Sequence, residues 1–255
     1  DPDAIEAALG GGCDLLYLET PTNPTLKILD LRRLIQAGHH AGATVVVDNT
    51  FATPVNQRPL ALGADLVVHS ATKFLGGHSD VLGGVLCGRD ELVREVFRFR
   101  EINGATLSAP AAHLLIRGIK TLELRVLRQN ENALGLARFL RDHPRVERVF
   151  HPGLEDDPGH RIASRQMSGY GGLVSFSLPG GLPDVRRVLG RLRYAHRAAS
   201  LGSVGTLIGP PAVTSHVELT PEERAELGIP ETLIRCSVGI ENLADLVEDF
   251  TRALA

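Results

Sequence analysis

Short apolar runs alternate with amphipathic helical patterns along the first half of the chain. Two runs rich in β-branched residues, Ala43–Asp48 and Leu66–His69, have the length and composition of fully buried strands. The compact apolar run Asp14–Glu19 has the pattern of a third strand. Helical spacing of apolar residues occurs over Asp1–Leu9 and Asp30–Ala41. This pattern indicates an α/β fold.

The pattern changes in the second half of the chain. A long helical pattern with few breaking residues runs over Thr121–Asp142, and we interpret it as a bridge between two domains with the boundary near Gln129. Beyond it short strand patterns alternate with helical ones, as is typical of an α+β domain. We therefore predict a first domain at residues 1–129 and a smaller second domain at residues 130–255. Its strands are expected at Val146–Phe150, Leu173–Leu178 and Leu233–Gly239, and its helices at Pro183–Leu192 and Asn242–Leu254.

Lysine is rare in this chain, and one lysine follows a buried strand pattern. Only Lys27, Lys73 and Lys120 occur among 27 lysine and arginine residues. An arginine stays protonated, whereas a desolvated lysine amine can lose its proton and attack a carbonyl carbon. Lys73 follows the run Leu66–His69, at the edge of the sheet where open α/β proteins bind ligands. It is therefore the candidate nucleophile, with a solvated loop lysine as the alternative.

An acidic residue ends the preceding strand pattern. Asp48 closes the run Ala43–Asp48, and Lys73 comes 25 residues later, after its own strand. A buried carboxylate needs a partner, because leaving a charge unpaired in the protein interior is costly. A helix cap or a loop brace is one role for Asp48, and contact with a bound ligand is the other. Because Asp48 and Lys73 each lie at the end of a strand of their own, the two together favour a ligand site.

Residues that suit anions occur at two further places. Ser70 and Thr72 flank the candidate lysine, and their hydroxyls are suited to a phosphate, although they could equally be capping hydroxyls. Arg235 lies within an apolar strand pattern, where an arginine usually binds an anion through two of its nitrogens. An internal salt bridge to Asp245 or Glu241 is the alternative for Arg235.

Four short motifs follow one another along the first half of the chain: Glu19-Thr-Pro-Thr-Asn-Pro24, Val47-Asp-Asn-Thr-Phe51, Ser70-Ala-Thr-Lys73 and Gly77-His-Ser-Asp80. Together they resemble the pyridoxal-phosphate (PLP) site of the transsulfuration, or Cys/Met metabolism, family. That family includes cystathionine γ-synthase, cystathionine γ-lyase, methionine γ-lyase and the homoserine sulfhydrylases. The resemblance continues to the end of the chain. It implies an α/β protein of PLP fold type I, aspartate aminotransferase-like, with a mostly parallel sheet in an incomplete large domain and a smaller C-terminal α+β domain.

The resemblance implies a cofactor, pyridoxal 5'-phosphate, and residues that bind it. Lys73 would bind the cofactor covalently and act as the catalytic base once a substrate has displaced it. Asp48 would keep the ring nitrogen protonated, so that the ring accepts negative charge. Ser70 and Thr72 would contact the phosphate group.

The resemblance also places three residues at the substrate. Asn23 would lie beside the cofactor ring and the substrate, and Arg235 and Ser200 would bind the α-carboxylate of the substrate. Two positions depart from the family pattern. Members that handle cystathionine usually have glutamates where this chain has Ala199 and Gly205, which weakens the case for recognition of the distal amino group of cystathionine.

The expected reaction is γ-replacement or γ-elimination at the C–S or C–O bond of an amino acid derived from homoserine or homocysteine. Methionine γ-lyase and O-acylhomoserine sulfhydrylase activity are the alternatives within the family. An aminotransferase on the same fold is less favoured, because two of the motifs resemble the sulfur branch. A catalytically silent subunit or fragment stays open as well. By the resemblance, roughly the first third of the family's chain is absent, including a cofactor-stacking tyrosine and part of the phosphate site.

Composition narrows the remaining classes of function. A formal net charge of −3 gives no reason to expect nucleic acid or an anionic membrane as a partner. No apolar run is long enough to span a bilayer, and the chain opens without a basic and apolar leader. Cys13, Cys87 and Cys236 are scattered, and His69 and His78 lack ligands at metal spacing, so neither disulfides nor a metal site are expected. A cytoplasmic setting fits best, and the resemblance implies a homo-oligomer, a dimer of dimers.

Overall fold

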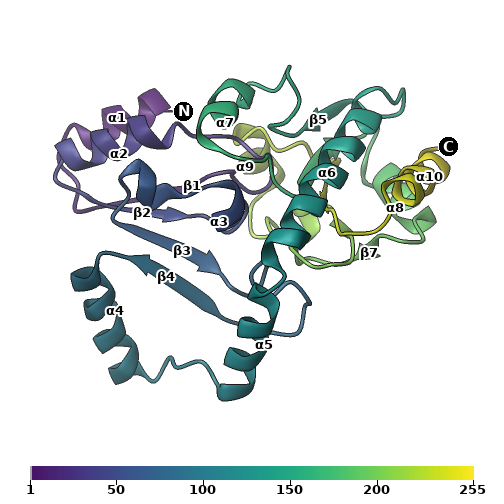
Figure 1. Cartoon of the computed structure of the whole chain (residues 1–255). Coiled ribbons are helices and arrows are strands. Elements are labelled where there is room, and N and C mark those ends of the chain that lie inside the picture. Colours follow the sequence, from purple (N-terminus) through teal and green to yellow (C-terminus); the bar gives the residue numbers. More distant parts are fainter. Residues whose placement is uncertain (1) are drawn as a thin grey trace.

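The computed structural model describes residues 2–255, and its first half is built on a four-stranded sheet (Figure 1). The strands lie in sequence order: β1 (Leu15–Glu19), β2 (Thr44–Asp48), β3 (Leu66–Ser70) and β4 (Gly84–Gly88). The first three are parallel, and β4 pairs with β3 in the antiparallel direction. The three parallel strands confirm the strand predictions for this half. Their carboxyl ends lie at one edge of the sheet.

One face of this sheet is covered by two helices, α1 (Pro2–Leu9) and α2 (Leu31–His40), which lie together above it in Figure 1. Helix α2 begins where the sequence predicts, because the Asp30 carboxylate accepts a hydrogen bond from the backbone N–H of Arg33. Its buried face packs on alternate strand residues such as Leu16 and Val45. The opposite side of β1 is open, since Leu15 and Tyr17 are 56% and 54% exposed.

Further helices connect the sheet to the rest of the chain. They are α3 (Thr53–Asn56), a 3-10 turn at Pro59–Leu62, α4 (Asp90–Asn103) and α5 (Ala109–Ile119). Helix α4 has no buried residue, although Phe99 and Ile102 are apolar. These two side chains are 69% and 85% exposed. Large apolar residues on a helix face are normally covered, so this side of the molecule has the composition of an interface.

The second half contains a five-stranded sheet in the spatial order β5-β6-β9-β8-β7. Its pairs are antiparallel except for β7 with β8. Helices pack against it around Phe176 and Phe250, whose rings meet edge to face. The strands are β5 (Arg148–Phe150), β6 (Leu173–Ser177), β7 (His196–Arg197), β8 (Leu207–Gly209) and β9 (Leu233–Ser237). The helices are α7 (His160–Gln166), α8 (Leu182–Arg191), α9 (Pro221–Glu226) and α10 (Leu243–Leu254), with a 3-10 turn at Pro211–Val213.

Helix α6 (Leu122–Arg141) confirms the long helix predicted over Thr121–Asp142, and it follows the first sheet and precedes the second along the chain (Figure 1). It is continuous across Gln129, so the domain boundary near that residue stays a prediction. The strand predicted from Val146 begins only at Arg148, because the backbone N–H of Val146 closes a turn on His143. No helix of residues 2–255 is both long and apolar enough to cross a bilayer.

Candidate active site

Three carboxyl-terminal strand residues converge at one edge of the first sheet. Glu19, Asp48 and Ser70 end β1, β2 and β3, and Lys73 follows three residues after β3. All four line a pocket of about 220 Å³, which is closed by residues of the second half, including Arg235. Adjacent parallel strands therefore bring the predicted amine and acid into one pocket, as expected for an open α/β sheet.

Lys73 has the environment of a reactive amine. Its Nζ donates a hydrogen bond to Ser200 Oγ at 3.1 Å. Burial, together with the positive charge of Arg235, lowers the pKa of the Lys73 amine below its usual value. A lowered pKa increases the fraction of free base near neutral pH, and the free base is the form that attacks a carbonyl or removes a proton. The alternative of a solvated loop lysine does not hold, because Lys73 is half-buried in a pocket.

An arginine that the sequence analysis did not single out, Arg125, binds the turn that carries Lys73. Arg125 on α6 is 4% exposed, and its Nη1 donates to the carbonyl of Phe74 at 2.9 Å. Its Nη2 donates to the carbonyl of Gly118 at 2.8 Å. At Gly77, where the turn passes α6, φ is +74° and a Cβ would collide with the Arg125 guanidinium. Arg125 therefore fixes the backbone beside the candidate nucleophile.

Arg235 binds no carboxylate within residues 2–255. Its Nη1 donates to Asn23 Oδ1 at 2.7 Å, and its Nη2 donates to the carbonyl of Ala199 at 2.9 Å. Glu241, one alternative partner, instead accepts from the backbone N–H and the hydroxyl of Thr206. Arg235 is 5% exposed, and burial lowers the pKa of its guanidinium. A buried cation held only by neutral oxygens is suited to bind an anion that enters the pocket.

Asp48 is oriented by two donors. Its Oδ1 accepts from the backbone N–H of Thr50 at 2.9 Å, and its Oδ2 accepts from the Tyr17 hydroxyl at 3.1 Å. Burial, followed by the charge of Asp48, raises the pKa of Tyr17 to about 12. Burial also raises the pKa of Glu19. The hydrogen bond from the backbone N–H of Asn23 lowers this pKa, and the negative charge of Asp48 raises it further, so the net shift is upward. The sequence analysis did not foresee the contribution of Tyr17, which lies on a neighbouring strand.

The two hydroxyls predicted to contact a phosphate lie in different settings. Ser70 lines the pocket, and within residues 2–255 only its backbone groups, not its hydroxyl, form hydrogen bonds. Thr72 does not line it, and its Oγ1 accepts from the backbone N–H of Gly83 at 3.1 Å. The backbone amides of Ser70 and Lys73 donate to Thr50 Oγ1 and to the Ser70 carbonyl. In this chain Ser70 is therefore the hydroxyl available to a ligand.

The donor set fits a pyridine aldehyde phosphate better than a metal. An amine with a lowered pKa and a carboxylate line the pocket together with a hydroxyl, which matches an aldehyde, a ring nitrogen and a phosphate ester. Within residues 2–255 no group of three or more His, Cys, Asp or Glu side chains could hold a metal ion. The two histidines near Lys73 have other settings. His69 is buried, which lowers its pKa, and His78 Nδ1 contacts the backbone carbonyl of Gly76.

Residues 1–255 match the sequence profile of the Cys/Met metabolism PLP-dependent enzymes over their whole length. The chain belongs to this family. Its fold is accordingly PLP fold type I, and its cofactor is pyridoxal 5'-phosphate.

Individual members of the Cys/Met metabolism family are closely similar to the chain. Chloroplastic cystathionine γ-synthase 1 of Nicotiana tabacum is 45% identical over 255 residues, which are all of this chain and 47% of that protein. L-methionine γ-lyase of Fusobacterium nucleatum is 44% identical over 256 residues, 65% of that protein. A crystal structure of cystathionine γ-synthase from Xanthomonas oryzae, 44% identical, superposes with a TM-score of 0.97 over 100% of this chain and 66% of that one. The chain thus spans about half to two thirds of the length of these relatives.

Proposed function

We propose that the protein catalyses γ-replacement or γ-elimination at the C–S or C–O bond of an amino acid derived from homoserine or homocysteine. The observation that carries this proposal is that one pocket holds both Lys73, whose amine has a lowered pKa, and the buried Arg235, which contacts no carboxylate within residues 2–255. The similar relatives include both a cystathionine γ-synthase and a methionine γ-lyase, at 45% and 44% identity. Methionine γ-lyase or O-acylhomoserine sulfhydrylase activity are the alternatives within this proposal.

Four residues of the chain would hold the cofactor. Lys73 would bind its aldehyde carbon, Asp48 would face its ring nitrogen, and Ser70 would contact its phosphate, with Asn23 beside the ring. The Thr72 hydroxyl accepts a hydrogen bond from the backbone N–H of Gly83. Its predicted contact with the phosphate would therefore require a different side-chain position. When bound, pyridoxal phosphate supplies an electron sink for the charge that develops when a proton leaves the substrate Cα.

The chain's own residues would then bind and orient the substrate. Arg235 would bind the α-carboxylate through its guanidinium, which hydrogen bonds to Asn23 Oδ1 and to the carbonyl of Ala199 already orient. Ser200 would lie near the same carboxylate, because its hydroxyl contacts the Lys73 amine. Fixing the carboxylate would hold the Cα–H bond of the substrate close to the Lys73 amine. Such orientation lowers the barrier to proton transfer.

Lys73 would move the protons of the reaction. As a free base it would remove a proton first from Cα and then from Cβ, and the electron pair freed at Cβ would expel the leaving group from Cγ. In replacement an incoming thiol forms the new C–S bond and releases its proton. In elimination water completes the reaction, and a 2-oxo acid and ammonia are released. Both outcomes use the same amine, held at one position by Ser200.

The test uses Lys73→Ala and Lys73→Arg with the purified protein, pyridoxal phosphate and a panel of homocysteine-pathway amino acids. We expect both variants to lose turnover and the visible absorption of the covalently bound cofactor, because neither side chain offers a free amine. Lys120→Ala, which removes an exposed lysine, is the matched control. Products would be identified as α-ketobutyrate, pyruvate or cystathionine. Keto-acid exchange without thiol release would identify an aminotransferase and overturn the proposal.

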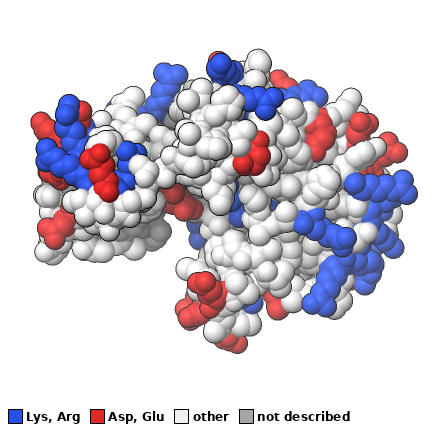
Figure 2. Space-filling model, turned by 90° about the horizontal axis from the view of Figure 1, so that it is seen from below, with Lys and Arg blue, Asp and Glu red and all other residues white. Residues whose placement is uncertain are grey.

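We further propose that the protein functions as a homo-oligomer in the cytoplasm. Exposed apolar side chains on α4, α5 and α6 support association, because Phe99, Ile116 and Leu124 are 69%, 62% and 72% exposed. Seen from below, the surface between two charged ends is mostly uncharged (Figure 2). All three cysteines are free, as suits a reducing compartment. Light scattering of the wild type and of Phe99→Glu tests the association, since a buried charge should dissociate the copies.

The open side of β1 favours a second candidate, a chain that becomes catalytic only with additional polypeptide. Leu15 and Tyr17 on β1 are more than half exposed, Tyr17 contacts Asp48 of the pocket, and the chain spans only part of the length of its relatives. In that case the purified protein should bind pyridoxal phosphate through Lys73 without turning over any amino acid of the panel. Turnover by the purified protein alone would exclude this candidate.

A further inference from the structure

Glu19, the last residue of β1, lines the Lys73 pocket but has no part in the function proposed above. Its side chain is half-buried, and its neighbour in the register between β1 and β2 is Asp48. Within residues 2–255 Glu19 forms no ion pair, and Oε1 accepts its one hydrogen bond, from the backbone N–H of Asn23 at 2.8 Å. A half-buried carboxylate without a cation is unfavourable, so a contribution elsewhere is expected to offset its cost.

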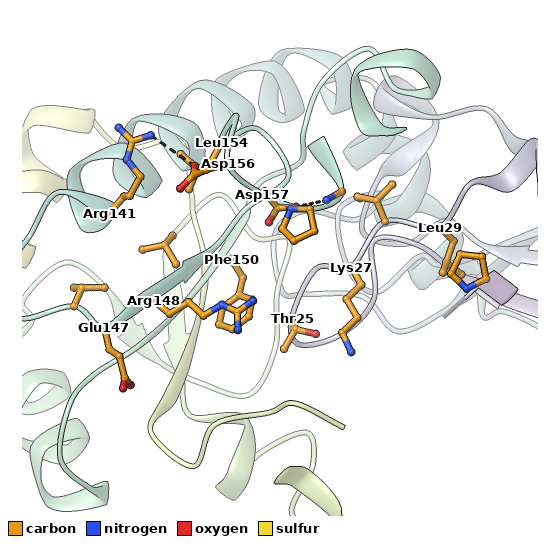
Figure 3. Close-up of a pocket in the computed structure, with 16 residues that line it drawn as sticks. Thr25, Lys27, Leu29, Arg141, Glu147, Arg148, Phe150, Leu154, Asp156 and Asp157 are labelled. Carbon is orange, nitrogen blue, oxygen red and sulfur yellow. Dashed lines mark hydrogen bonds and ion pairs between the residues drawn. The ribbon is translucent and has the colours of Figure 1, made fainter. Parts of the chain in front are cut away.

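The charges of the largest cavity of the described residues are balanced, in contrast to the setting of Glu19. This cavity measures about 660 Å³ and is lined by parts of the segments 25–29 and 146–150 (Figure 3). Asp156 lies 3.9 Å from Arg141, to which a dashed line joins it in Figure 3, and the charge of Arg148 acts on Asp157. Three cations and three carboxylates line the cavity: Lys27, Arg141, Arg148, Glu147, Asp156 and Asp157. The isolated acid therefore lies in the smaller pocket, beside Lys73.

Glu19 fixes one peptide group of the loop that follows β1. The next backbone polar group along this loop, the carbonyl of Pro24, is held by the Ser175 hydroxyl of β6 at 2.7 Å. The backbone N–H of Asn23 has Glu19 as its partner. The Glu19 carboxylate therefore anchors the loop at Asn23, and a charged acceptor makes this hydrogen bond stronger than a neutral one would.

The side chain of Asn23 connects this anchor to Arg235. Asn23 Oδ1 accepts from Arg235 Nη1 at 2.7 Å, and the other support of the guanidinium is the carbonyl of Ala199, which accepts from Nη2 at 2.9 Å. Because Asn23 donates to Glu19 and accepts from Arg235, a shift of its backbone would move the oxygen that orients the guanidinium. The two ends of this chain of hydrogen bonds, Glu19 and Arg235, line the same pocket.

We propose that Glu19 is a positioning residue, which acts through Asn23 to orient Arg235 for the α-carboxylate of the substrate. The inference rests on the carboxylate-binding role proposed for Arg235 and adds a residue to it. An arginine binds a carboxylate through two parallel hydrogen bonds when its planar guanidinium is aligned with the carboxylate. Loss of the hydrogen bond between Glu19 and Asn23 should therefore lower the affinity for the carboxylate of a ligand and leave its other contacts unchanged.

Two ligands that differ only in a carboxylate isolate this effect. L-norleucine and pentylamine share one side chain and one amino group, and neither has a leaving group at Cγ, so both can be measured without γ-elimination or γ-replacement. Each is titrated against the protein loaded with pyridoxal phosphate, and the change in visible absorption gives its Kd. The ratio of the two Kd values is the carboxylate preference. A variant that only loosens the pocket or the cofactor weakens both ligands and leaves this ratio unchanged.

Two conservative variants separate the hydrogen bond of Glu19 from its charge. Glu19→Gln removes the charge and keeps an acceptor for the Asn23 N–H, so its carboxylate preference should stay within about twofold of the wild type. Glu19→Asp keeps the charge but withdraws the acceptor by one methylene, so its preference should fall about fivefold. Glu248→Ala removes an exposed acid on α10 and is the control, with an unchanged preference.

Asn23→Ala tests the route of the effect, because it removes the oxygen that accepts from Arg235. In that background Glu19→Asp should not lower the carboxylate preference further. Arg235→Gln should lower the preference about thirtyfold, since hydrogen bonds to charged groups are the strong ones.

The outcomes distinguish this inference from the proposed function. If Arg235→Gln leaves the carboxylate preference unchanged, the carboxylate site and the role of Glu19 are both wrong. If Arg235→Gln lowers the preference but Glu19→Asp behaves like the wild type, or Glu19→Gln loses as much as Glu19→Asp, only the role of Glu19 is wrong. The measurement requires no turnover, so an inactive wild type would overturn the proposed reaction and leave this result intact.

Discussion

Lys73 Nζ donates to Ser200 Oγ at 3.1 Å across 127 residues of sequence. The contact joins the turn after β3 to a loop of the second half, so the reactive amine is positioned by both halves of the chain. Ser200 in turn lies next to Ala199, whose carbonyl accepts from Arg235. One short loop thereby sets the distance between the proposed base and the proposed carboxylate-binding group.

Replacing Ser200 with alanine should reduce kcat/KM by about tenfold, because the amine loses the hydrogen bond that holds it and gains rotational freedom. Ser200→Thr keeps the hydroxyl and should recover most of the activity. The measurement is the steady-state rate at several pH values, which separates a change in the pKa of the base from a loss of orientation. Ser164→Ala, on the exposed side of α7, is the control. Equal rates for Ser200→Ala and wild type would show that the contact is incidental.

Removing the charge of Arg235 should raise the pKa of the Lys73 amine, because burial and that charge both lower it in the native protein. Competitive acetylation of the cofactor-free protein, followed by mass spectrometry, reports the pH at which each amine becomes reactive. Lys73 should react at lower pH than exposed Lys120, and Arg235→Gln should move the Lys73 curve to higher pH. Arg128→Gln is the matched control. An unchanged Lys73 curve in Arg235→Gln would contradict the assigned cause.

The sequence was sufficient to predict that Lys73 and Asp48 lie in one pocket, because the position of each depends on a short strand directly before it. Each follows a short buried strand, and parallel strands adjacent in sequence are usually adjacent in the sheet. Tyr17 was not foreseen as a partner of Asp48, since the contact depends on the register between β1 and β2. Arg125 was missed for a similar reason. Its helical pattern is that of an exposed residue, and its burial depends on the close approach of α6 to Gly77.

Arg125→Met should lower the free energy of unfolding by about 2–4 kcal/mol. The substitution leaves the buried carbonyls of Phe74 and Gly118 without their charged donor, which costs more than the lost bonds alone. Arg125→Lys should recover only part of the stability, because an ammonium lacks the planar fork that reaches both carbonyls. Urea denaturation measures the effect. Arg128 lies three residues further along α6 and is exposed. Arg128→Met should therefore change the free energy of unfolding by less than about 0.5 kcal/mol. Similar losses for both variants would show that Arg125 has no special role.

His151 should make the protein less stable as the pH falls below neutrality. The side chain is fully buried, and burial lowers its pKa to about 4 from an ordinary value of 6.5. Between pH 6.5 and pH 4 the unfolded chain binds a proton at His151 that the folded chain does not. The contribution of neutral His151 to the free energy of unfolding is therefore fully present above pH 6.5 and is lost as the pH falls towards 4. The loss is about 3 kcal/mol, since each pKa unit corresponds to about 1.4 kcal/mol.

Replacing His151 with asparagine removes the titrating group and keeps an acceptor for the backbone N–H of Gly153, which now donates to His151 Nδ1 at 3.0 Å. The variant should therefore have a flatter dependence of unfolding free energy on pH between 7 and 4, even if it is less stable at pH 7. His113→Asn, on the exposed face of α5, should keep the slope of the wild type. Denaturant titrations at four pH values measure both slopes. If the slope of His151→Asn equals that of the wild type, other groups are responsible for the acid sensitivity.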